Sequence, residues 1–447
     1  MATRVIPPRI LKKLRYNTAT KPFQPHLTSP ALSPPNILDQ KPPSSATTLI
    51  PPAVADINFH DVEKLFSYVP TSKLLRSTAV LHATAVEPLV DLGTWIMRSD
   101  LMQTNNPVKD LALSATRATF FDHFCAGEDA ATAGKSIAGL NEAGLRGMLV
   151  YGIEDAHDND ACDRNLKAFL HTVDVSRSLP PSSVSFNIVK ITAICPMSLL
   201  ERMSDLLRWQ KKDPSMVLPW KQDSLPIFSD LSPLYHTRKR PEPLTAQEER
   251  DLELANKRFQ ELCEKCVQCN IPLLVDAEFT SVQPAIDYFT YAAAIVHNKG
   301  ENPIVFGTMQ TYLKDAKDRL LLTSKAADKM GIPMGFKLVR GAYMSSERKL
   351  AADLGKLAAA KAHELGMGKV NHKMEFAQLY GMSEALSFGL SNAGFQVSKY
   401  MPFGPVETVM PYLLRRAEEN RGVLAASGFD RKLMRKELFR RAKSAVF

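Results

Sequence analysis

Short apolar runs, several of them rich in β-branched residues, recur from residue 147 onward, and each is followed by a stretch with helical spacing. The runs lie at 147–153, 185–194, 271–279, 302–310, 335–343, 374–382 and 395–404. Nearly continuous apolar runs that alternate with helices are typical of a parallel sheet covered on both faces. Seven or eight such units in about 300 residues favour an α/β fold of the (β/α)₈ TIM-like type over a doubly wound sheet. No G-x-G-x-x-G follows any run, which argues against a Rossmann dinucleotide fold.

Two segments depart from this alternation. Residues 57–135 have helical patterns without strand alternation, so a helical region is expected before the barrel. Residues 209–244 are rich in proline and polar side chains and are predicted to be an inserted surface loop. The expected organisation is a leader at 1–55, a helical region at 56–140, a barrel at 141–430 and a basic C-terminal helix or tail at 431–447.

The positive charge of the chain is concentrated in its leader. Residues 1–38 hold six Lys and Arg and no Asp or Glu, and without them the net charge falls from +9 to +3. The rest of the chain is therefore nearly neutral, and no nucleic-acid partner is expected. An acid-free leader with Arg, Ser and Thr is typical of mitochondrial import, although an ordinary tail is the alternative. No run of 18 apolar residues is present, so no transmembrane helix is predicted.

The cysteines do not indicate a metal site. Six cysteines in 447 residues are too few for a disulfide framework. Cys263, Cys266 and Cys269 have the spacing of a cluster ligand set, but no fourth soft ligand is near them in the sequence. They lie at the end of a helix that is predicted to begin with a capping box at Thr245–Glu248. Buried helical thiols are therefore expected, and no metal.

Polar and aromatic side chains end most of the predicted strands. These residues are Lys190, Asp276, Glu278, Gln310, Arg340, Tyr343 and Tyr400. In a TIM-like barrel the active site lies at the carboxyl ends of the strands. Each residue alone is more often a capping or salt-bridging group, but the shared position favours a joint site.

Two adjacent arginines follow the last predicted strand. Gly404–Pro405 predicts a helix start, and Pro411 predicts a kink or a restart. Glu419 lies one turn after Arg415 and Arg416, so one carboxylate could hold either guanidinium. An exposed ion pair between an arginine and Glu419 would contribute only about 0.5 kcal/mol to the stability of the fold. At a barrel mouth the two guanidiniums would instead bind a carboxylate. The pattern alone leaves both interpretations open.

Four segments closely resemble the proline dehydrogenase family in its plant form. They are "LLVDAEFTSVQPAID" (273–287), "FKLVRGAY" (336–343), "FAQLYGMSEAL" (376–386) and "YMPFGPVETVMPYLLRRAEEN" (400–420). The resemblance runs from about residue 60 to the C-terminus. It implies a barrel that binds FAD without a Rossmann motif and oxidises L-proline to Δ1-pyrroline-5-carboxylate. It also implies a membrane quinone as electron acceptor and a mitochondrial location on the matrix side of the inner membrane.

The resemblance assigns site residues individually. The substrate and catalytic set that it implies is Lys190, Asp276, Tyr343, Leu379, Tyr400, Arg415, Arg416 and Glu419. Within this set the arginine pair would grip the substrate carboxylate with help from Glu419, and Tyr343, Leu379 and Tyr400 would enclose the proline ring. The flavin-contacting set that it implies is Gln310, Lys337, Val339, Arg340 and Gly341.

The sequence departs from the family pattern after the fifth strand. The family has two helices there, separated by a strand that ends in a Thr-His-Asn motif. In this chain "SSERKLAADLGKLAAAKAHELG" (345–366) runs directly from the first helix into the second. Roughly 45 residues, including one barrel strand, are expected to be missing after Gly355, which would leave two unpaired sheet edges. The alternative function is therefore a truncated isoform with weak or no FAD binding, which acts, if at all, by protein association.

The C-terminal segment 431–447 has seven Lys and Arg and one acidic residue. Its apolar side chains are Leu433, Met434, Leu438 and Phe439. A basic amphipathic segment of this kind could lie on an anionic membrane surface, or it could be an ordinary exposed terminal helix.

Overall fold

The computed structural model describes most of the chain, and the structural statements below concern those residues. They are residues 2–4, 58–102, 106–232, 234, 237, 239–313, 315–339, 374–421 and 424–446.

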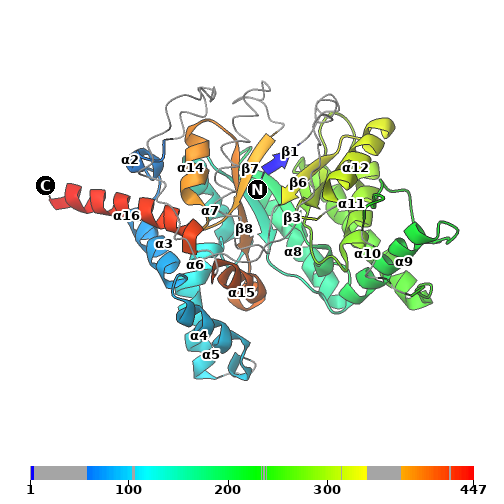
Figure 1. Ribbon diagram of the computed structural model, residues 1–447, viewed down its shortest axis with the longest axis horizontal. Coiled ribbons are helices and arrows are strands. Elements are labelled where there is room, and N and C mark those ends of the chain that lie inside the picture. The colour runs from blue at the N-terminus through cyan, green and yellow to red at the C-terminus, as the bar shows by residue number, and fades with distance from the viewer. Residues whose placement is uncertain are drawn as a thin grey trace, which may run out of the picture.

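Seven parallel strands form the wall of a barrel (Figure 1). They are β2 (Arg146–Tyr151), β3 (Val184–Val189), β4 (Leu273–Val275), β5 (Val305–Gln310), β6 (Gly335–Val339), β7 (Met374–Leu379) and β8 (Val397–Phe403). Their order around the wall is β6-β5-β4-β3-β2-β8-β7. This arrangement confirms the predicted α/β barrel class with seven parallel strands.

The remaining position in the ring is filled from the N-terminus of the chain. Strand β1 (Ala2–Arg4) is antiparallel to both β6 and β7, with Ala2 opposite Leu338 on one side and Phe376 on the other. The expectation of two unpaired edges is therefore wrong, because β1 closes the ring. The closure is short: β1 pairs with β6 through two residues, whereas β5 and β6 pair through five. Three residues of the expected leader thus belong to the barrel, and the other leader residues lie outside the described part of the chain.

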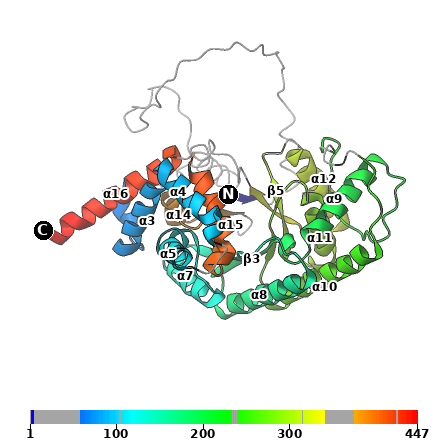
Figure 2. The same ribbon diagram turned by 90° about the horizontal axis from the view of Figure 1, so that it is seen from below.

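Helices cover the outside of the strands (Figure 2). They are α8 (Asn159–Ser178), α9 (Met197–Lys212), α10 (Ala246–Cys269), α11 (Gln283–His297), α12 (Ala316–Met330) and α14 (Glu384–Asn392). The inserted loop begins at residue 213 and not at 209, because α9 continues to Lys212 and ends with two lysines in its last turn. Cations in that position are favoured by the helix dipole. None of the described helices is both long and apolar enough to cross a bilayer.

Helix α10 confirms the predicted capping box. The Thr245 hydroxyl accepts a hydrogen bond from the Glu248 amide at 3.2 Å, and the Glu248 carboxylate accepts one from the Thr245 amide at 2.7 Å. Cys263 and Cys266 are buried near the end of this helix, and burial raises the pKa of Cys266 to about 12. These thiols pack as small apolar groups, as expected.

The helical region before the barrel is also confirmed. It comprises α2 (Val62–Leu65), α3 (Thr71–Ala83), α4 (Glu87–Arg98), η2 (Asp100–Met102), α5 (Pro107–Thr116), the π-helical turn η3 (Arg117–Phe121), α6 (Asp122–Phe124) and α7 (Ala130–Glu142). Helices α4 and α5 project away from the barrel at the bottom of the view (Figure 1). Helix α15 (Val406–Arg421) packs against them and begins one residue after Pro405. It is a single helix that continues through Pro411, so the predicted restart does not occur.

The C-terminal helix α16 (Leu424–Val446) begins earlier than the predicted boundary at 431. Leu433 and Met434 are buried in the same apolar cluster as side chains of α2 and α3. The Glu437 carboxylate accepts hydrogen bonds from Arg440 and Arg441. Most of the apolar face that suggested membrane contact therefore packs against the protein itself.

A fully buried lysine anchors the loop that follows β7. Lys399, on β8, has no exposed surface, and its ammonium donates to the Met382 carbonyl at 2.8 Å. The same ammonium lies 3.2 Å from a carboxylate oxygen of Glu384 and 3.5 Å from the Leu379 carbonyl. Burial lowers the pKa of Lys399, although Glu384 opposes that shift. One side chain thus ties β8 to the end of β7 and to the start of α14.

We expect Lys399→Met to lower the free energy of unfolding by about 3 kcal/mol, because removing one partner of a buried ion pair leaves the other uncompensated. Urea denaturation measures the change. The matched control is Lys265→Met, which removes a half-exposed ion pair with Asp174 and should cost less than about 1 kcal/mol. Equal effects of the two substitutions would show that Lys399 does not anchor the loop.

Candidate functional site

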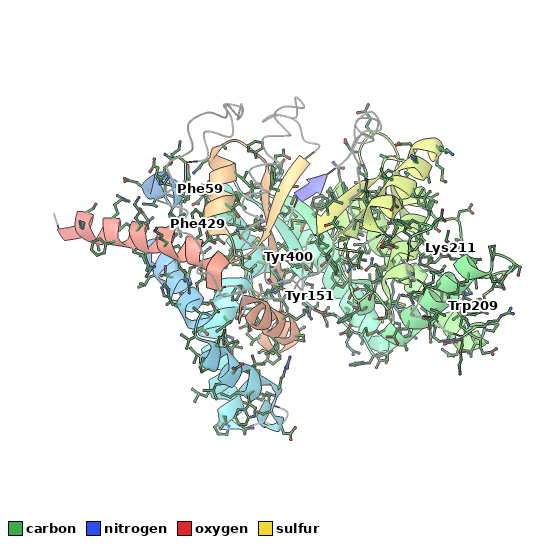
Figure 3. All side chains as sticks on the ribbon, viewed as in Figure 1. Phe59, Tyr151, Trp209, Lys211, Tyr400 and Phe429 are labelled. Atoms are coloured by element: carbon green, nitrogen blue, oxygen red, sulfur yellow. The ribbon has the colours of Figure 1, made fainter. Side chains whose placement is uncertain are left out.

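A cavity of about 110 Å³ lies at the carboxyl ends of the barrel strands, beneath α15. Its lining residues are Glu154, Lys190, Asp276, Ala277, Glu278, Phe279, Thr308, Gln310, Tyr312, Lys337, Val339, Leu379, Tyr400, Tyr412, Arg415 and Arg416. Tyr400 marks this region near the centre of the molecule in Figure 3. One water needs roughly 10–15 Å³, so the cavity has room for a small ligand.

Most of the residues expected at the site meet in this cavity. Those that line it are Lys190, Asp276, Gln310, Lys337, Val339, Leu379, Tyr400, Arg415 and Arg416. Arg340, Gly341 and Tyr343 lie outside the described residues, so their predicted roles stay predictions. Glu419 belongs to α15, but its side chain is not part of the description.

Asp276 stands at the centre of the polar contacts. Its carboxylate accepts a hydrogen bond from the Lys337 ammonium and another, at 2.9 Å, from the Tyr400 hydroxyl. The Lys190 ammonium lies 3.9 Å from the same carboxylate. Burial alone would raise the pKa of Asp276, but Lys337 and Lys190 outweigh it and hold the pKa below its usual value. Asp276 is therefore a charged anchor between residues of three other strand ends.

Lys190 keeps its proton in this setting. Burial would lower the pKa of its ammonium, but the charges of Glu154, Asp276 and Glu278 outweigh that effect and raise it. Tyr400 also keeps its proton, because burial and the neighbouring Asp276 raise the pKa of its phenol. At neutral pH Lys190 therefore carries a positive charge, and the Tyr400 hydroxyl donates a hydrogen bond to Asp276.

The two arginines of α15 lie at the mouth of the barrel. Arg415 forms an ion pair with Glu154, which lies in the loop after β2. The Arg416 guanidinium is 5.0 Å from the ring centre of Tyr412, and the residue is only 7% exposed. This placement favours the anion-binding interpretation of the pair over the exposed one. The arginines bring two positive charges to a cavity with apolar and aromatic walls.

Glu154 is a site residue that sequence reasoning missed. The acidic run 154–163 has the composition of a helix start, and α8 does begin within it, with Asp158 as its N-cap. Glu154, however, precedes that cap and follows the end of β2 by only three residues. Its distance from the strand end was the available signal, since the carboxyl ends of barrel strands carry the active site.

Glu278 lies two residues after Asp276 on the same wall. Its carboxylate accepts hydrogen bonds from the Thr192 amide at 3.2 Å and from the Thr192 hydroxyl at 2.6 Å. Burial raises the pKa of Glu278 to about 7, although Lys190 and Thr192 oppose that shift. Glu278 therefore changes its charge near neutral pH.

Gln310, the last residue of β5, offers an acceptor to a bound group. Its amide nitrogen donates to the Glu278 carbonyl at 2.9 Å and to the Tyr312 hydroxyl at 3.0 Å. Its side-chain oxygen is buried and has no hydrogen-bond partner among the described residues. A buried acceptor without a partner is costly, so an N–H group of a ligand would stabilise it.

A larger cavity, of about 440 Å³, lies between α3, α7 and the start of α14. Two of its cations already have partners. Arg76 forms an ion pair with Asp122 at 2.6 Å, and Lys73 donates to the Tyr380 hydroxyl at 3.0 Å. The smaller cavity is the better candidate, because the strand ends place several charged groups around it.

Comparison with known proteins shows which family the sequence matches. A family model described as "Proline dehydrogenase" matches residues 133–356 and 355–430. Proline dehydrogenase 2, mitochondrial, of Arabidopsis thaliana is 51% identical over 450 residues, which cover 88% of this chain and 94% of the relative. Proline dehydrogenase 1, mitochondrial, of the same plant is 52% identical over 437 residues and 87% of each chain.

Solved structures share the fold at low sequence identity. Proline utilization A (PutA) from Bdellovibrio bacteriovorus, inactivated by N-propargylglycine, superposes with a TM-score of 0.58 at 15% identity. The match covers 83% of this chain and 41% of that one. A bifunctional proline utilization A protein superposes with a TM-score of 0.51 at 16% identity and covers 88% and 45%. This chain thus spans less than half the length of these structures, and the likeness supports the barrel fold alone.

We expect Asp276→Asn to lower the free energy of unfolding at pH 7 by about 3 kcal/mol, because Lys337 would lose its buried counter-charge. A carboxyl whose folded pKa is depressed stabilises the fold above its usual pKa of 3.8, and that contribution is lost as the pH falls through the folded value. The difference in the free energy of unfolding between Asp276→Asn and wild type should therefore shrink below pH 3.8.

Chemical denaturation at several pH values measures this difference. The matched control is Asp230→Asn, whose side chain is 99% exposed in its ion pair with Lys211 and should change stability by less than about 1 kcal/mol. A difference for Asp276→Asn that stays constant on acidification would contradict the assigned charge.

Proposed function

The chain belongs to the proline dehydrogenase family, and we propose that it is the oxidoreductase that converts L-proline to Δ1-pyrroline-5-carboxylate with FAD as hydride acceptor. The observation that carries this proposal is the position of Arg415 and Arg416 over the cavity at the strand ends. A small amino acid with a carboxylate and an apolar ring matches the charge and the walls of that cavity.

The substrate carboxylate would bind to the arginine pair. Guanidinium groups form bidentate, charge-assisted hydrogen bonds with carboxylates, and these are stronger than neutral hydrogen bonds. Tyr412 supports the Arg416 guanidinium through its ring face. Leu379, the last residue of β7, and Tyr400, in the middle of β8, would then contact the proline ring.

FAD, when bound, supplies the hydride acceptor, and the protein positions the C–H bond against it. The unpartnered oxygen of Gln310 fits an N–H group of a flavin ring. Lys337 and Val339 of β6 line the same cavity and are proposed flavin contacts. Arg340 and Gly341 complete the proposed flavin set. The donor and acceptor groups of the described wall thus suit this cofactor.

The mouth of the cavity can exclude water. The ion pair between Arg415 of α15 and Glu154 joins the helix to the loop after β2. A closed mouth strengthens the electrostatic contacts inside the cavity and fixes the approach geometry of the substrate. Glu154 is therefore a proposed partner of the arginine pair, alongside Glu419.

We extend the proposal to a quinone electron acceptor and to the matrix side of the inner mitochondrial membrane. The leader composition and the word "mitochondrial" in the names of both Arabidopsis relatives support the compartment. Because Leu433 and Met434 pack inward, a peripheral membrane contact would use exposed apolar residues such as Phe439 of α16 and Trp95 of α4.

Arg416→Ala should raise the KM for L-proline by about 100-fold, since loss of one partner of a buried charged pair costs 2–5 kcal/mol. Dye reduction by L-proline measures KM, and the flavin absorbance shows whether the cofactor is still bound. Arg250→Ala, on the surface of α10, is the matched control and should leave KM unchanged. An unchanged substrate dependence for Arg416→Ala would refute the carboxylate clamp.

A second candidate function is that of a truncated isoform with weak or no FAD binding and no catalysis. The family model matches in two parts that meet at residues 355 and 356, where a segment was expected to be missing. The alignment with the first Arabidopsis relative spans 450 residues, although 88% of this chain is only about 393. In the fold this break falls between β6 and β7, which are joined only through the short β1.

If the chain is a truncated isoform, it should bind little flavin. After identical purification, this chain should contain substoichiometric FAD, whereas either Arabidopsis relative serves as the full-length control. Insertion of the relative's segment after Gly355 should raise the flavin content, because a full parallel strand would then replace the short β1 between β6 and β7. Flavin absorbance per protein measures the outcome. Stoichiometric flavin and normal proline oxidation by the unmodified chain would refute the second candidate.

A further inference from the structure

Three carboxylates line the cavity, and they differ in what they bind. Asp276 accepts hydrogen bonds from the Lys337 ammonium and the Tyr400 hydroxyl. Glu154 is paired with the Arg415 guanidinium. Glu278 differs from both, because the donors that reach its carboxylate, as far as the described residues show, are the neutral backbone amide and hydroxyl of Thr192.

This difference decides which group of the wall can take up a proton. A carboxylate in an ion pair is a weak base, because protonation would break the pair. The cations of the wall, including Lys190, are already protonated, and burial keeps Tyr400 in its neutral form. Glu278 is the carboxylate of the described wall whose protonation breaks no ion pair. A base with a pKa near the working pH is also the most effective, and that of Glu278 is about 7.

Two charged side chains act on the Glu278 carboxylate. Lys190, at the end of β3, stabilises its charged form, and Glu154, in the loop after β2, destabilises it. Its own backbone amide donates to the side-chain oxygen of Gln283 at 2.9 Å, and its carbonyl accepts from Gln310. These two contacts fix the backbone of Glu278, and its carboxylate is held by the hydroxyl of Thr192.

Thr192 connects Glu278 to the rim of the barrel. Its hydroxyl donates to Glu278 at 2.6 Å and accepts a hydrogen bond from the Asp155 amide at 3.3 Å. The same hydroxyl stabilises the charged form of the Asp155 carboxyl and so opposes the rise in its pKa that burial causes. Asp155 is partly exposed, its backbone has a φ of 58°, and its Oδ1 has no partner among the residues that the structure covers. A left-handed residue at a functional site is held there by its surroundings.

We propose that Glu278 accepts the proton that the substrate amine must release, and that the Thr192 hydroxyl positions the Glu278 carboxylate for this step. This inference rests on the proposed function. The N–H bond of the substrate ammonium breaks, the electron pair stays on nitrogen, and the proton goes to the Glu278 carboxylate. FAD, when bound, would accept the hydride from the ring carbon, and the nitrogen lone pair would then form the C=N bond. Atoms and electrons balance: one proton leaves by Glu278 and one hydride leaves by the cofactor.

The test compares Glu278→Gln with wild type over pH 5 to 9. We expect kcat to fall about 100-fold, as is usual for the loss of a general base, with KM for L-proline and flavin content within about twofold of wild type. The rise of wild-type kcat/KM through pH 7 should disappear. Thr192→Val should lower kcat, and Thr192→Ser, which keeps the hydroxyl, should restore it. Glu249→Gln, on the surface of α10, is the control.

A second measurement does not depend on turnover. Because the folded pKa of Glu278 lies above its usual value of 4.5, ionisation costs stability as the pH rises from 4.5 to about 7. Wild type should therefore lose stability relative to Glu278→Gln across that interval. A stability difference between wild type and Glu278→Gln that does not change with pH would contradict the assignment of Glu278 as the proton acceptor. A Glu278→Gln variant with wild-type kcat and pH profile would contradict it as well. A wild-type protein that does not oxidise L-proline would instead refute the proposed function, so the two failures are distinguishable.

Discussion

The burial of opposite charges at the carboxyl ends of the strands is the constraint on which the site depends. Lys190, Asp276, Lys337 and Tyr400 come from four different strands, yet their polar atoms converge on one carboxylate. A buried charge without a partner costs several kcal/mol, so each of these groups is tolerable only while the others stay in register. The order of the strands around the barrel therefore controls the chemistry as well as the fold.

The face of β8 that is turned away from the cavity has its own buried ion pair, between Lys399 and Glu384. Leu379 and Tyr400 face the cavity, whereas Lys399, next to Tyr400 on β8, points away and binds the loop after Leu379. Successive side chains of a strand point to opposite faces, so one short segment can line the cavity and hold the surrounding helices. This arrangement makes the ends of β7 and β8 rigid, which suits residues that must contact a small ring.

The position of the short strand β1 has consequences for the cofactor. It lies between β6, which carries Lys337, and β7, which carries Leu379. The break in the family match falls in the same interval of the chain. The proposed substrate-binding groups on α15 are remote from this interval in the sequence, whereas the proposed flavin contacts on β6 adjoin it. A defect in the ring would thus affect the cofactor before the arginine clamp.

The sequence by itself determined the barrel class, the helical region before it and the capping box of α10, because hydrophobic periodicity and capping are local properties. It also singled out Asp276, Gln310 and Tyr400, since each ends an apolar run. It could not show whether Arg415 and Arg416 lie on the surface or at the barrel mouth, because an exposed ion pair and a carboxylate-binding pair have the same sequence pattern. Only the tertiary structure placed the two arginines over the cavity at the strand ends and revealed Glu154 as the partner of Arg415, because Arg415 and Glu154 are 261 positions apart and meet only when the barrel closes.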